Sequence, residues 1–573
     1  MRDDERGRGH APAPLTRAEL WWLALALALL AALKLPYSSA WTFPAGYDGG
    51  YYTNIVQNLL AGDGLTTDVS LYHRGFRDFP HHDSIHPLWP LIYAAFAWAF
   101  PLERVAVWLP TALYFTSLLA AWAWGRRVSP GDLFRRAPGF HGGHLLVVVL
   151  GLQSAYFVHT SRPFTEGLAY TLLFLFLWRA VLLLQRRSWR DGLEAGAWLG
   201  ALLLVRSQFA VVVASAVLAL ALGLVLYAAD RRRLVVFGAC AALAMLLTML
   251  PYALYLGQNA DGHFSIWNYL FFGETPADSP LSQARPYLRP SGLAHLALLG
   301  RGVLVAFQWR IKTSYLGSYH LFHYALPVAL AVGAWALGRG GVGPERRARA
   351  LAWLRDPKNA PWLLFGVLAV LLFLSCQLLV KSHDRWYFHR RHNLVTLPLF
   401  SFALLALLRA RWRLVAWVGA ALFVGGTIMG VAQLGQATLK VLRTPPSPPK
   451  PELVGWLNAE QQRLGRPLIV AFNQPQVIVW QTPELSYHEV NVEISTLDDV
   501  LIMFDELGTD YLVSRVRKNV RHRADLARLQ QDLELLPQVQ LGGVEVYRRR
   551  RPDAPPPPPP WSATAADDDG DDD

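Results

Sequence analysis

An aspartate followed by two glycines stands directly behind the first long apolar run of the chain. The stretch reads GYDGGYYTNIVQNLLAGDGL over 46–65. A carboxylate in such a place can take a proton from a substrate hydroxyl, which is the work of a general base. We predict that Asp48 is catalytic and that Tyr51 and Tyr52 contact the substrate with their rings. Anchoring at a membrane surface is the alternative use of these tyrosines.

Basic residues occur at the ends of several apolar runs. Arg206 stands between two runs joined by almost no loop, and Arg390 and Arg391 begin another run. An arginine at a membrane boundary is costly unless an anion accompanies it, and its guanidinium matches the oxygens of a phosphate. We predict that these arginines and Lys312 bind a lipid-linked phosphate. The alternative for each is a charge solvated at a helix end.

Three further residues complete the predicted substrate site. His86 opens the segment HPLW, and Arg162 and Glu166 share the short turn TSRPFTEG. Asp63 and Asp68 also lie in the first loop, where we interpret them as turn or solvated residues.

A group of histidines in the same loop has the ligand types that Zn²⁺ or Mn²⁺ accept. Its spacing matches no closed structural site, so we predict that no cofactor is required. The candidates for a divalent ion are His73, His82 and Asp83.

The elements that must position these residues are membrane helices. Of 573 residues, 53% are hydrophobic and 17% are charged. Apolar runs of about 20 residues recur along the chain, which indicates a polytopic α-helical membrane protein. The chain has a net charge of +12, and its basic residues lie mostly in short loops between the apolar runs. Membrane topology therefore explains the charge better than a nucleic-acid partner does. Cys240 and Cys376 lie inside apolar runs and form no disulfide framework.

The apolar runs predict about eleven membrane spans. They are 19–40, 104–125, 144–160, 164–185, 192–206, 208–229, 234–256, 320–338, 361–380, 393–408 and 413–435. Lysine and arginine concentrate in alternate loops, which predicts a cytoplasmic N-terminus and an extracytoplasmic C-terminus. The segments 86–100 and 291–307 are expected to lie in the interface. A signal peptide cut after Ala40 is the alternative to a retained first helix.

Composition also divides the chain into domains. A cytoplasmic segment (1–18) precedes a membrane domain (19–440) whose first outer loop is 41–103. A Pro-rich linker (441–452) leads to a small soluble α/β domain (453–550), and the tail 551–573 has the composition of a disordered segment. In the α/β domain, PLIVAF, DYLVSRV and GGVEVYRR are predicted strands, and LDDVLIMFDELG and RADLARLQQDLELL are predicted helices.

The stretch YDGGYYTNIVQNLLAGDGLTTD, followed by IHPLWPLIYA, resembles the first outer loop of the GT-C superfamily of membrane glycosyltransferases. The similar branch is the family 39-like one, with protein O-mannosyltransferases and aminoarabinose transferases. TSRPFTEGLAYTLLFLFLW, LLLVRSQFAVVV and RRHNLVTLPLF are similar to later segments of that family. An acidic pair of the family is reduced to Asp48 here, and its Ser-Glu-Pro turn becomes Arg-Pro-Phe-Thr-Glu.

The resemblance implies an inverting transferase of the inner or plasma membrane. It would move a sugar from a polyprenyl-phosphate donor to an extracytoplasmic acceptor, which is an envelope glycan, a lipid or a protein. Asp48 would be the general base, the arginines would neutralise the departing phosphate, and the C-terminal domain would bind or orient the acceptor.

Two other classes of function remain open. One is a transporter or flippase of an anionic polyprenyl-linked lipid, and the other is a scaffold without catalysis. Transporters often carry internal repeats and helices broken at mid-membrane, and we find neither in this sequence.

Overall fold

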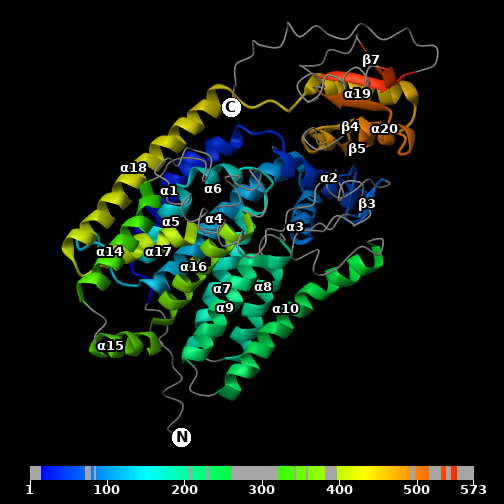
Figure 1. Ribbon diagram of the computed structural model, residues 1–573. Coiled ribbons are helices and arrows are strands. Elements are labelled where there is room, and N and C mark those ends of the chain that lie inside the picture. The colour runs from blue at the N-terminus through cyan, green and yellow to red at the C-terminus, as the bar shows by residue number, and fades with distance from the viewer. Residues whose placement is uncertain are drawn as a thin grey trace. The chain divides into compact units, whose positions relative to one another are not determined.

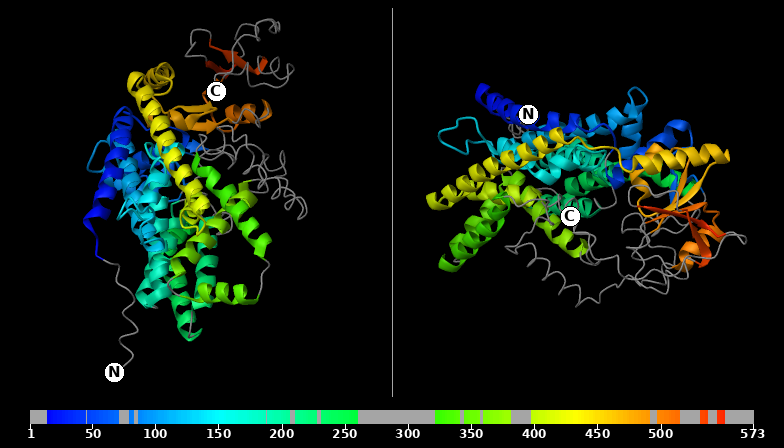
Figure 2. Two further views of the ribbon diagram at one scale, coloured as in Figure 1. Left: turned by 90° about the vertical axis from the view of Figure 1, so that its left-hand side faces the viewer. Right: turned by 90° about the horizontal axis from the view of Figure 1, so that it is seen from above.

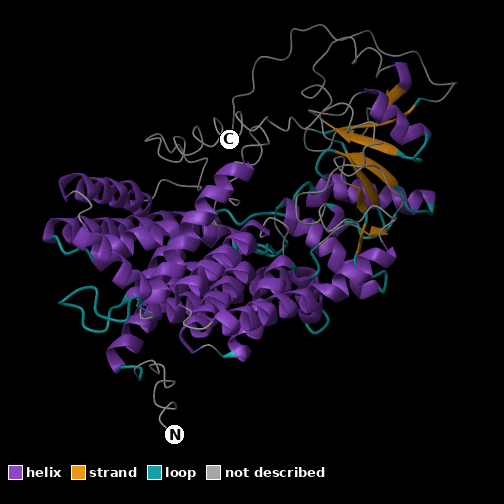
Figure 3. Cartoon of the chain, turned by 60° about the horizontal axis from the view of Figure 1, so that its bottom comes forward, coloured by secondary structure: helices purple, strands orange, loops and turns teal. Residues whose placement is uncertain are grey.

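The computed structural model describes most of the chain, and the described residues fall into two compact units. They are 14–44, 46–70, 79–82, 86–186, 188–205, 210–227, 231–259, 321–340, 344–356, 359–380, 397–490, 497–514, 531–536 and 544–550. We call 1–44, 84–274 and 282–446 the membrane unit, and 45–83, 275–281 and 447–573 the sheet unit. Figure 3 shows that the strands gather in the sheet unit.

The membrane unit is a bundle of helices (Figure 1). The helices are α1 (Arg17–Ser39), α3 (Leu88–Ala97), α4 (Leu102–Val128), α5 (Gly142–Gly151), α6 (Ser154–His159), α7 (Glu166–Arg186), α8 (Trp189–Leu203), α9 (Ala210–Tyr227), α10 (Arg231–Asn259), η3 (Leu321–Tyr324), α14 (Ala325–Gly340), α15 (Pro344–Arg355), α16 (Ala360–Val380), α17 (Leu397–Leu408) and α18 (Arg413–Arg443). Helix α4 packs against α5 and α7, α8 packs against α7 and α10, and α18 packs against α1 and α17.

Five helices in the described residues are long and apolar enough to cross a membrane, namely α1, α4, α7, α10 and α18. Helix α18, yellow in Figure 2, exposes Leu414 and Trp417 by 76% and 73%. Apolar side chains so exposed are a liability in water but are natural in contact with lipid tails. The predicted class, a helical membrane protein with a smaller sheet-containing part, is therefore confirmed. The number of spans stays a prediction.

One predicted span is divided into two helices. The sequence predicts a continuous span over 144–160, but α5 ends at Gly151 and α6 begins at Ser154. A Cβ atom at Gly151 would lie 2.4 Å from Cδ1 of Leu30, so the Leu30 side chain of α1 packs closely on the end of α5. The Tyr114 hydroxyl donates to the Gly151 carbonyl at 2.8 Å and satisfies one acceptor at the end of α5.

Other boundaries differ less. Helix α18 runs past the predicted end at 435 to Arg443, and α15 lies in the predicted loop 339–358. Helix α3 falls inside the predicted interfacial segment 86–100. The segment 291–307 lies outside the described residues.

The sheet unit is built on one mixed sheet with the strand order β2-β5-β4-β6-β8-β7. Its strands are β2 (Val69–Ser70), β4 (Ile469–Phe472), β5 (Ser486–Glu489), β6 (Tyr511–Ser514), β7 (Leu533–Leu535) and β8 (Glu545–Arg549). Strands β2, β5, β4 and β6 are parallel, and β8 pairs antiparallel with both β6 and β7. Strands and a helix expected in the C-terminal part are present as β4, β6, β8 and α20 (Leu497–Asp505).

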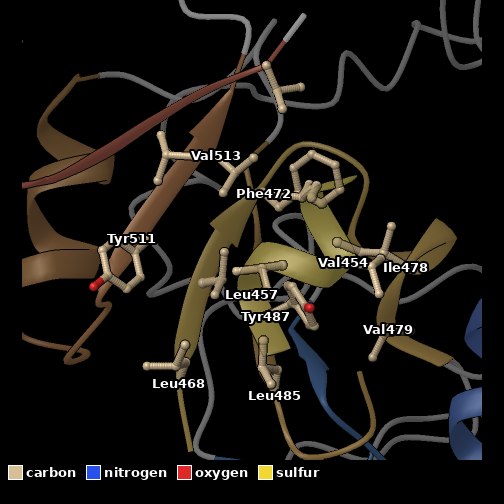
Figure 4. Close-up of a cluster of buried hydrophobic side chains, with 14 of the residues drawn as sticks. Val454, Leu457, Leu468, Phe472, Ile478, Val479, Leu485, Tyr487, Tyr511 and Val513 are labelled. Atoms are coloured by element: carbon tan, nitrogen blue, oxygen red, sulfur yellow. The ribbon is translucent and has the colours of Figure 1, made fainter. Parts of the chain in front are cut away.

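The core of the sheet unit lies on both faces of this sheet. Val470 and Phe472 of β4 enter one apolar cluster, and Ala471 between them enters the other, because side chains alternate along a strand. Figure 4 shows the first cluster, in which Leu457 of α19 (Pro451–Leu464) lies beside Tyr487 of β5. The second cluster contains residues of α20.

The end of one predicted helix is a strand. The sequence predicts a helix for RADLARLQQDLELL, but its last residues form β7. Leu533 is buried in the second cluster and pairs with Arg549 of β8. The burial of Leu533 in the core and its pairing in the sheet outweigh the local helix propensity of this stretch.

An edge strand of the sheet comes from the first loop of the chain. Val69 and Ser70 pair with Tyr487 and His488, and Val69 is buried in the first cluster. The sheet unit therefore includes 45–83, which the sequence assigns to the membrane domain. Within the same segment, β1 (Thr66–Thr67) pairs antiparallel with β3 (His81–His82). Strands of two residues are too short to show the alternation that would reveal them in a sequence.

The buried ring of His488 makes the stability of the sheet unit depend on pH. Burial, and then the charge of nearby His81, lowers the pKa of His488 from 6.5 to about 4. The folded unit keeps this imidazole neutral, whereas the unfolded chain takes up a proton below its ordinary pKa. Stability is therefore fully present above pH 6.5 and is lost as the pH falls toward 4, by about 3 kcal/mol.

Hydrogen exchange of the β4 and β5 amides in the full-length protein measures this loss. We expect the opening free energy of the wild type to fall between pH 6.5 and 4. The variant His488→Leu should lose most of that dependence. Equal pH dependence in both proteins would exclude His488 as its source.

Candidate active site

Asp48 lies in the first turn of α2 (Tyr47–Ala61), and its side chain is half-buried. The residue before the helix, Gly46, has φ +87°, a conformation that glycine adopts without strain. A pair of glycines is a common turn signal in a sequence, but Gly49 and Gly50 belong to the helix itself. The N-terminal amides and the dipole of α2 favour a negative charge on Asp48.

Gly50 allows close packing of α2 against the C-terminal segment. A Cβ atom at Gly50 would lie 1.8 Å from the carbonyl oxygen of Gln476 in η7 (Pro475–Val477). Farther along α2, the Gln57 amide donates to the carbonyl of Trp480 in η8 (Val479–Gln481) at 3.0 Å. Two contacts along its length therefore fix α2 on η7 and η8. The apolar face of α2 is buried in protein at Ile55 and Val56.

The two tyrosines after Asp48 belong to the packing of the sheet unit. Tyr52 is 6% exposed, and Tyr51 is half-buried against the first apolar cluster. Their ring centroids are 6.4 Å apart and tilted by 59°. Contacts of these rings with a substrate stay a prediction.

Asp68 lies at a bend between β1 and β2, in agreement with its interpretation as a turn residue, but it is buried rather than solvated. Its Oδ2 accepts hydrogen bonds from the amides of Asn54 at 2.8 Å and Asn58 at 2.9 Å. The Asn54 Oδ1 in turn accepts from the hydroxyl of Thr67 and the backbone N–H of Asp68, both at 3.0 Å. Burial raises the pKa of Asp68, while the two amides oppose that rise. Asp63 is exposed, as expected.

Three stretches singled out in the sequence meet in the membrane unit. The Trp89 indole donates to the carbonyl of Pro163 at 3.0 Å, and the backbone N–H of Leu88 donates to the carbonyl of Leu204 at 3.0 Å. The start of α3, the turn before α7 and the end of α8 are thus tied together. His86, two residues before Leu88, is half-buried.

Arg162 and Glu166 lie on either side of the turn before α7. The Arg162 guanidinium carbon is 5.2 Å from the centre of the Trp41 ring, within the range of a cation–π contact. Glu166 occupies the first turn of α7 and is 4% exposed.

The predicted phosphate-binding residues are not among those described. Arg206 follows the described Val205 directly in sequence, but it lies outside the described residues. The same holds for Lys312, Arg390 and Arg391, and for the metal candidates His73 and Asp83.

No group of three or more His, Cys, Asp and Glu side chains within the described ranges is arranged to hold a metal ion. His82, the remaining candidate, is on β3 opposite Thr66.

Lys34 is a buried residue of α1 that the sequence reasoning missed. Its Nζ donates to the hydroxyls of Thr160 at 2.9 Å and Ser161 at 2.6 Å, and to the carbonyl of Phe157. It also lies 4.7 Å from the centre of the Tyr114 ring. Lys34 therefore ties α1 to the turn that carries Arg162. A lysine inside an apolar run is expensive in a membrane unless it has partners, and this signal was present in the sequence.

Comparison with known proteins finds solved structures with a similar fold. No protein-family model and no curated protein matches the chain. The oligosaccharyltransferase AglB from Archaeoglobus fulgidus, solved with an inhibitory peptide and a dolichol-phosphate, aligns at 12% identity over 94% of this chain and 75% of that one, with a TM-score of 0.53. ArnT from Cupriavidus metallidurans, solved with undecaprenyl phosphate, aligns at 14% identity over 92% and 97%, with a TM-score of 0.47.

The likeness to AglB, at 12% identity, shows a shared fold. The resemblance found in the sequence is thereby confirmed at the level of the fold.

We expect Lys34→Met to destabilise the membrane unit. Methionine keeps the length of the side chain but removes the donors to the turn before α7, so buried oxygens lose a partner. The loss should be about 1–3 kcal/mol. Thermal unfolding in detergent measures it, with the exposed Lys440→Met as the matched control. Equal melting temperatures for the two variants would contradict the role of Lys34.

Proposed function

We propose that the protein is a membrane glycosyltransferase that takes a sugar from a polyprenyl-phosphate donor. The observation that carries the proposal is the fold shared with AglB, a transferase solved with a dolichol-phosphate. The acceptor is a glycan, lipid or protein at the extracytoplasmic face of the inner or plasma membrane. Chemistry outside the cytoplasm has no nucleotide sugars, and this favours a lipid phosphate as the leaving group.

Asp48 is the general base in this proposal. Its carboxylate accepts the proton of an acceptor hydroxyl, and the hydroxyl oxygen attacks the anomeric carbon of the donor sugar. The bond between that carbon and the phosphate oxygen breaks, and the polyprenyl phosphate leaves with the electron pair. Attack from the face opposite the phosphate inverts the anomeric configuration. The support for this role is the half-buried carboxylate in the first turn of α2.

Arg206, Arg390, Arg391 and Lys312 neutralise the departing phosphate. The support for this role is the chemistry of guanidinium groups and the placement of these residues at the ends of apolar runs. Charges that already face the phosphate lower the barrier because no solvent must reorganise during the reaction.

His86, Arg162 and Glu166 contact the substrate in the proposal. Their support is the set of hydrogen bonds that ties α3, the turn before α7 and the end of α8 into one junction. Lys34 and Trp41 fix the turn on α1 and thereby limit the movement of Arg162.

Purified protein incubated with polyprenyl-phosphate sugars that carry a radiolabelled sugar tests the proposal. We expect release of polyprenyl phosphate and transfer of label to an acceptor from the native envelope. Reconstituted vesicles provide the second readout. Movement of intact donor between leaflets with no cleavage of the sugar would replace the transferase by a flippase.

We expect Asp48→Asn to lower the turnover rate by about 10²–10⁴-fold. Asparagine has nearly the same shape but cannot take the proton at neutral pH. Donor binding should persist because the basic residues hold the phosphate. Single-turnover transfer and a donor-binding assay separate the two effects.

Asp63→Asn is the matched control, since Asp63 is an exposed acid of the same loop. It should keep nearly the wild-type rate. An Asp48→Asn variant that is well expressed, binds donor and turns over at the wild-type rate would remove Asp48 from the mechanism. Glu166 would then be the acid to test next.

A further inference from the structure

Asp68 joins the helix that carries Asp48 to the C-terminal sheet. Its backbone carbonyl accepts a hydrogen bond from the N–H of Tyr487 in β5 at 2.7 Å. Its side-chain Oδ2 accepts from Asn54 and Asn58, which lie one turn apart on α2. One residue thus bonds to the sheet through its main chain and to α2 through its carboxylate.

Hydrogen bonds donated in both directions between α2 and Asp68 fix a single register of the helix against this residue. Asn54 donates to Asp68 through its amide nitrogen, and its Oδ1 accepts from the Asp68 N–H at 3.0 Å. All three side chains are buried. A slip of α2 by one residue would leave several buried polar groups without partners, at roughly 1–3 kcal/mol for each group.

The contacts of α2 with η7 and η8 act in the same direction. The backbone of Gly50 rests on the Gln476 carbonyl, and the Gln57 amide reaches Trp480. These contacts and the Asp68 bonds set the axial position of α2, and therefore the position of Asp48 two residues before Gly50.

We propose that Asp68 is a positioning residue for Asp48 and that the C-terminal segment is a structural part of the catalytic loop. This inference rests on the proposed function, in which Asp48 is the base. It assigns the C-terminal segment a task other than acceptor binding alone. Misplacement of a catalytic group by about 1 Å can cost about 10²-fold in rate, so the position of α2 affects the turnover rate.

The test compares Asp68→Asn with a swap of the two groups. Asn54 and Asn58 both donate to Oδ2 of Asp68, so Asp68→Asn replaces a charged acceptor by a weaker, neutral amide oxygen. The double variant Asp68→Asn/Asn58→Asp restores an acid between the same two elements. Full-length protein in detergent is used throughout, and Asp63→Asn serves as the control.

Hydrogen exchange of the α2 amides is the first readout, and it does not depend on any reaction. We expect exchange to be at least about tenfold faster in Asp68→Asn, and close to wild type in the double variant. Unchanged protection of α2 in Asp68→Asn would overturn the proposal, as would a failure of the double variant to restore protection.

Transfer kinetics are the second readout. We expect Asp68→Asn to lower kcat by about 10²-fold with the KM for donor within about threefold, and the double variant to recover most of kcat. Full activity of Asp68→Asn with a loosened α2 would overturn the positioning role. Absence of transfer in the wild type would instead overturn the proposed function, and hydrogen exchange would still decide whether Asp68 fixes α2.

Discussion

The parallel pairing of Val69 and Ser70 with β5 is the constraint on which the candidate active site depends. It places a strand of the first loop in a sheet whose other strands all come from residues beyond 468. Because Asp68 precedes this strand and bonds to α2, the position of α2 follows from the position of the sheet. The orientation of Asp48, in the first turn of α2, therefore depends on the C-terminal segment.

The membrane unit is held together by hydrogen bonds between the ends of its helices. Its junction of α3, α7 and α8 uses side-chain and backbone donors to satisfy carbonyl oxygens at helix ends, as Trp89 does for Pro163 and Leu88 does for Leu204. Buried carbonyls without a donor would be costly. Lys34 does the same for the carbonyl of Phe157. Polar residues inside the bundle thus hold the turn that carries Arg162.

The sequence predicts what depends on long patterns. Apolar runs of membrane length locate α1, α4, α7 and α18, and alternating segments locate β4 and β6. The acid at the start of α2 stands out by its residue type alone. The shared fold with AglB agrees with the resemblance carried by the loop around Asp48.

Features that depend on contacts between distant residues escape the sequence. Gly50 looks like a turn glycine, but a side chain at this position would clash with the backbone of Gln476, which is far away in the sequence. The close approach of Leu30 to Gly151 does not show in the sequence, and Asp68 looks solvated until its partners on α2 are known. Strand β2 is too short to carry a period of its own. Only the tertiary fold contains this information.

The pairing of β2 with β5 also sets an order of events during biosynthesis. A ribosome makes α2 and β2 early and completes β5 only after all the helices of the membrane unit have been translated. Until then Val69 has no strand beside it and Gly50 has no Gln476 to rest on. A chain whose synthesis stops within the membrane unit can insert its helices, but it lacks the residues that position Asp48. The acid thus reaches its final position only in a chain translated through β5.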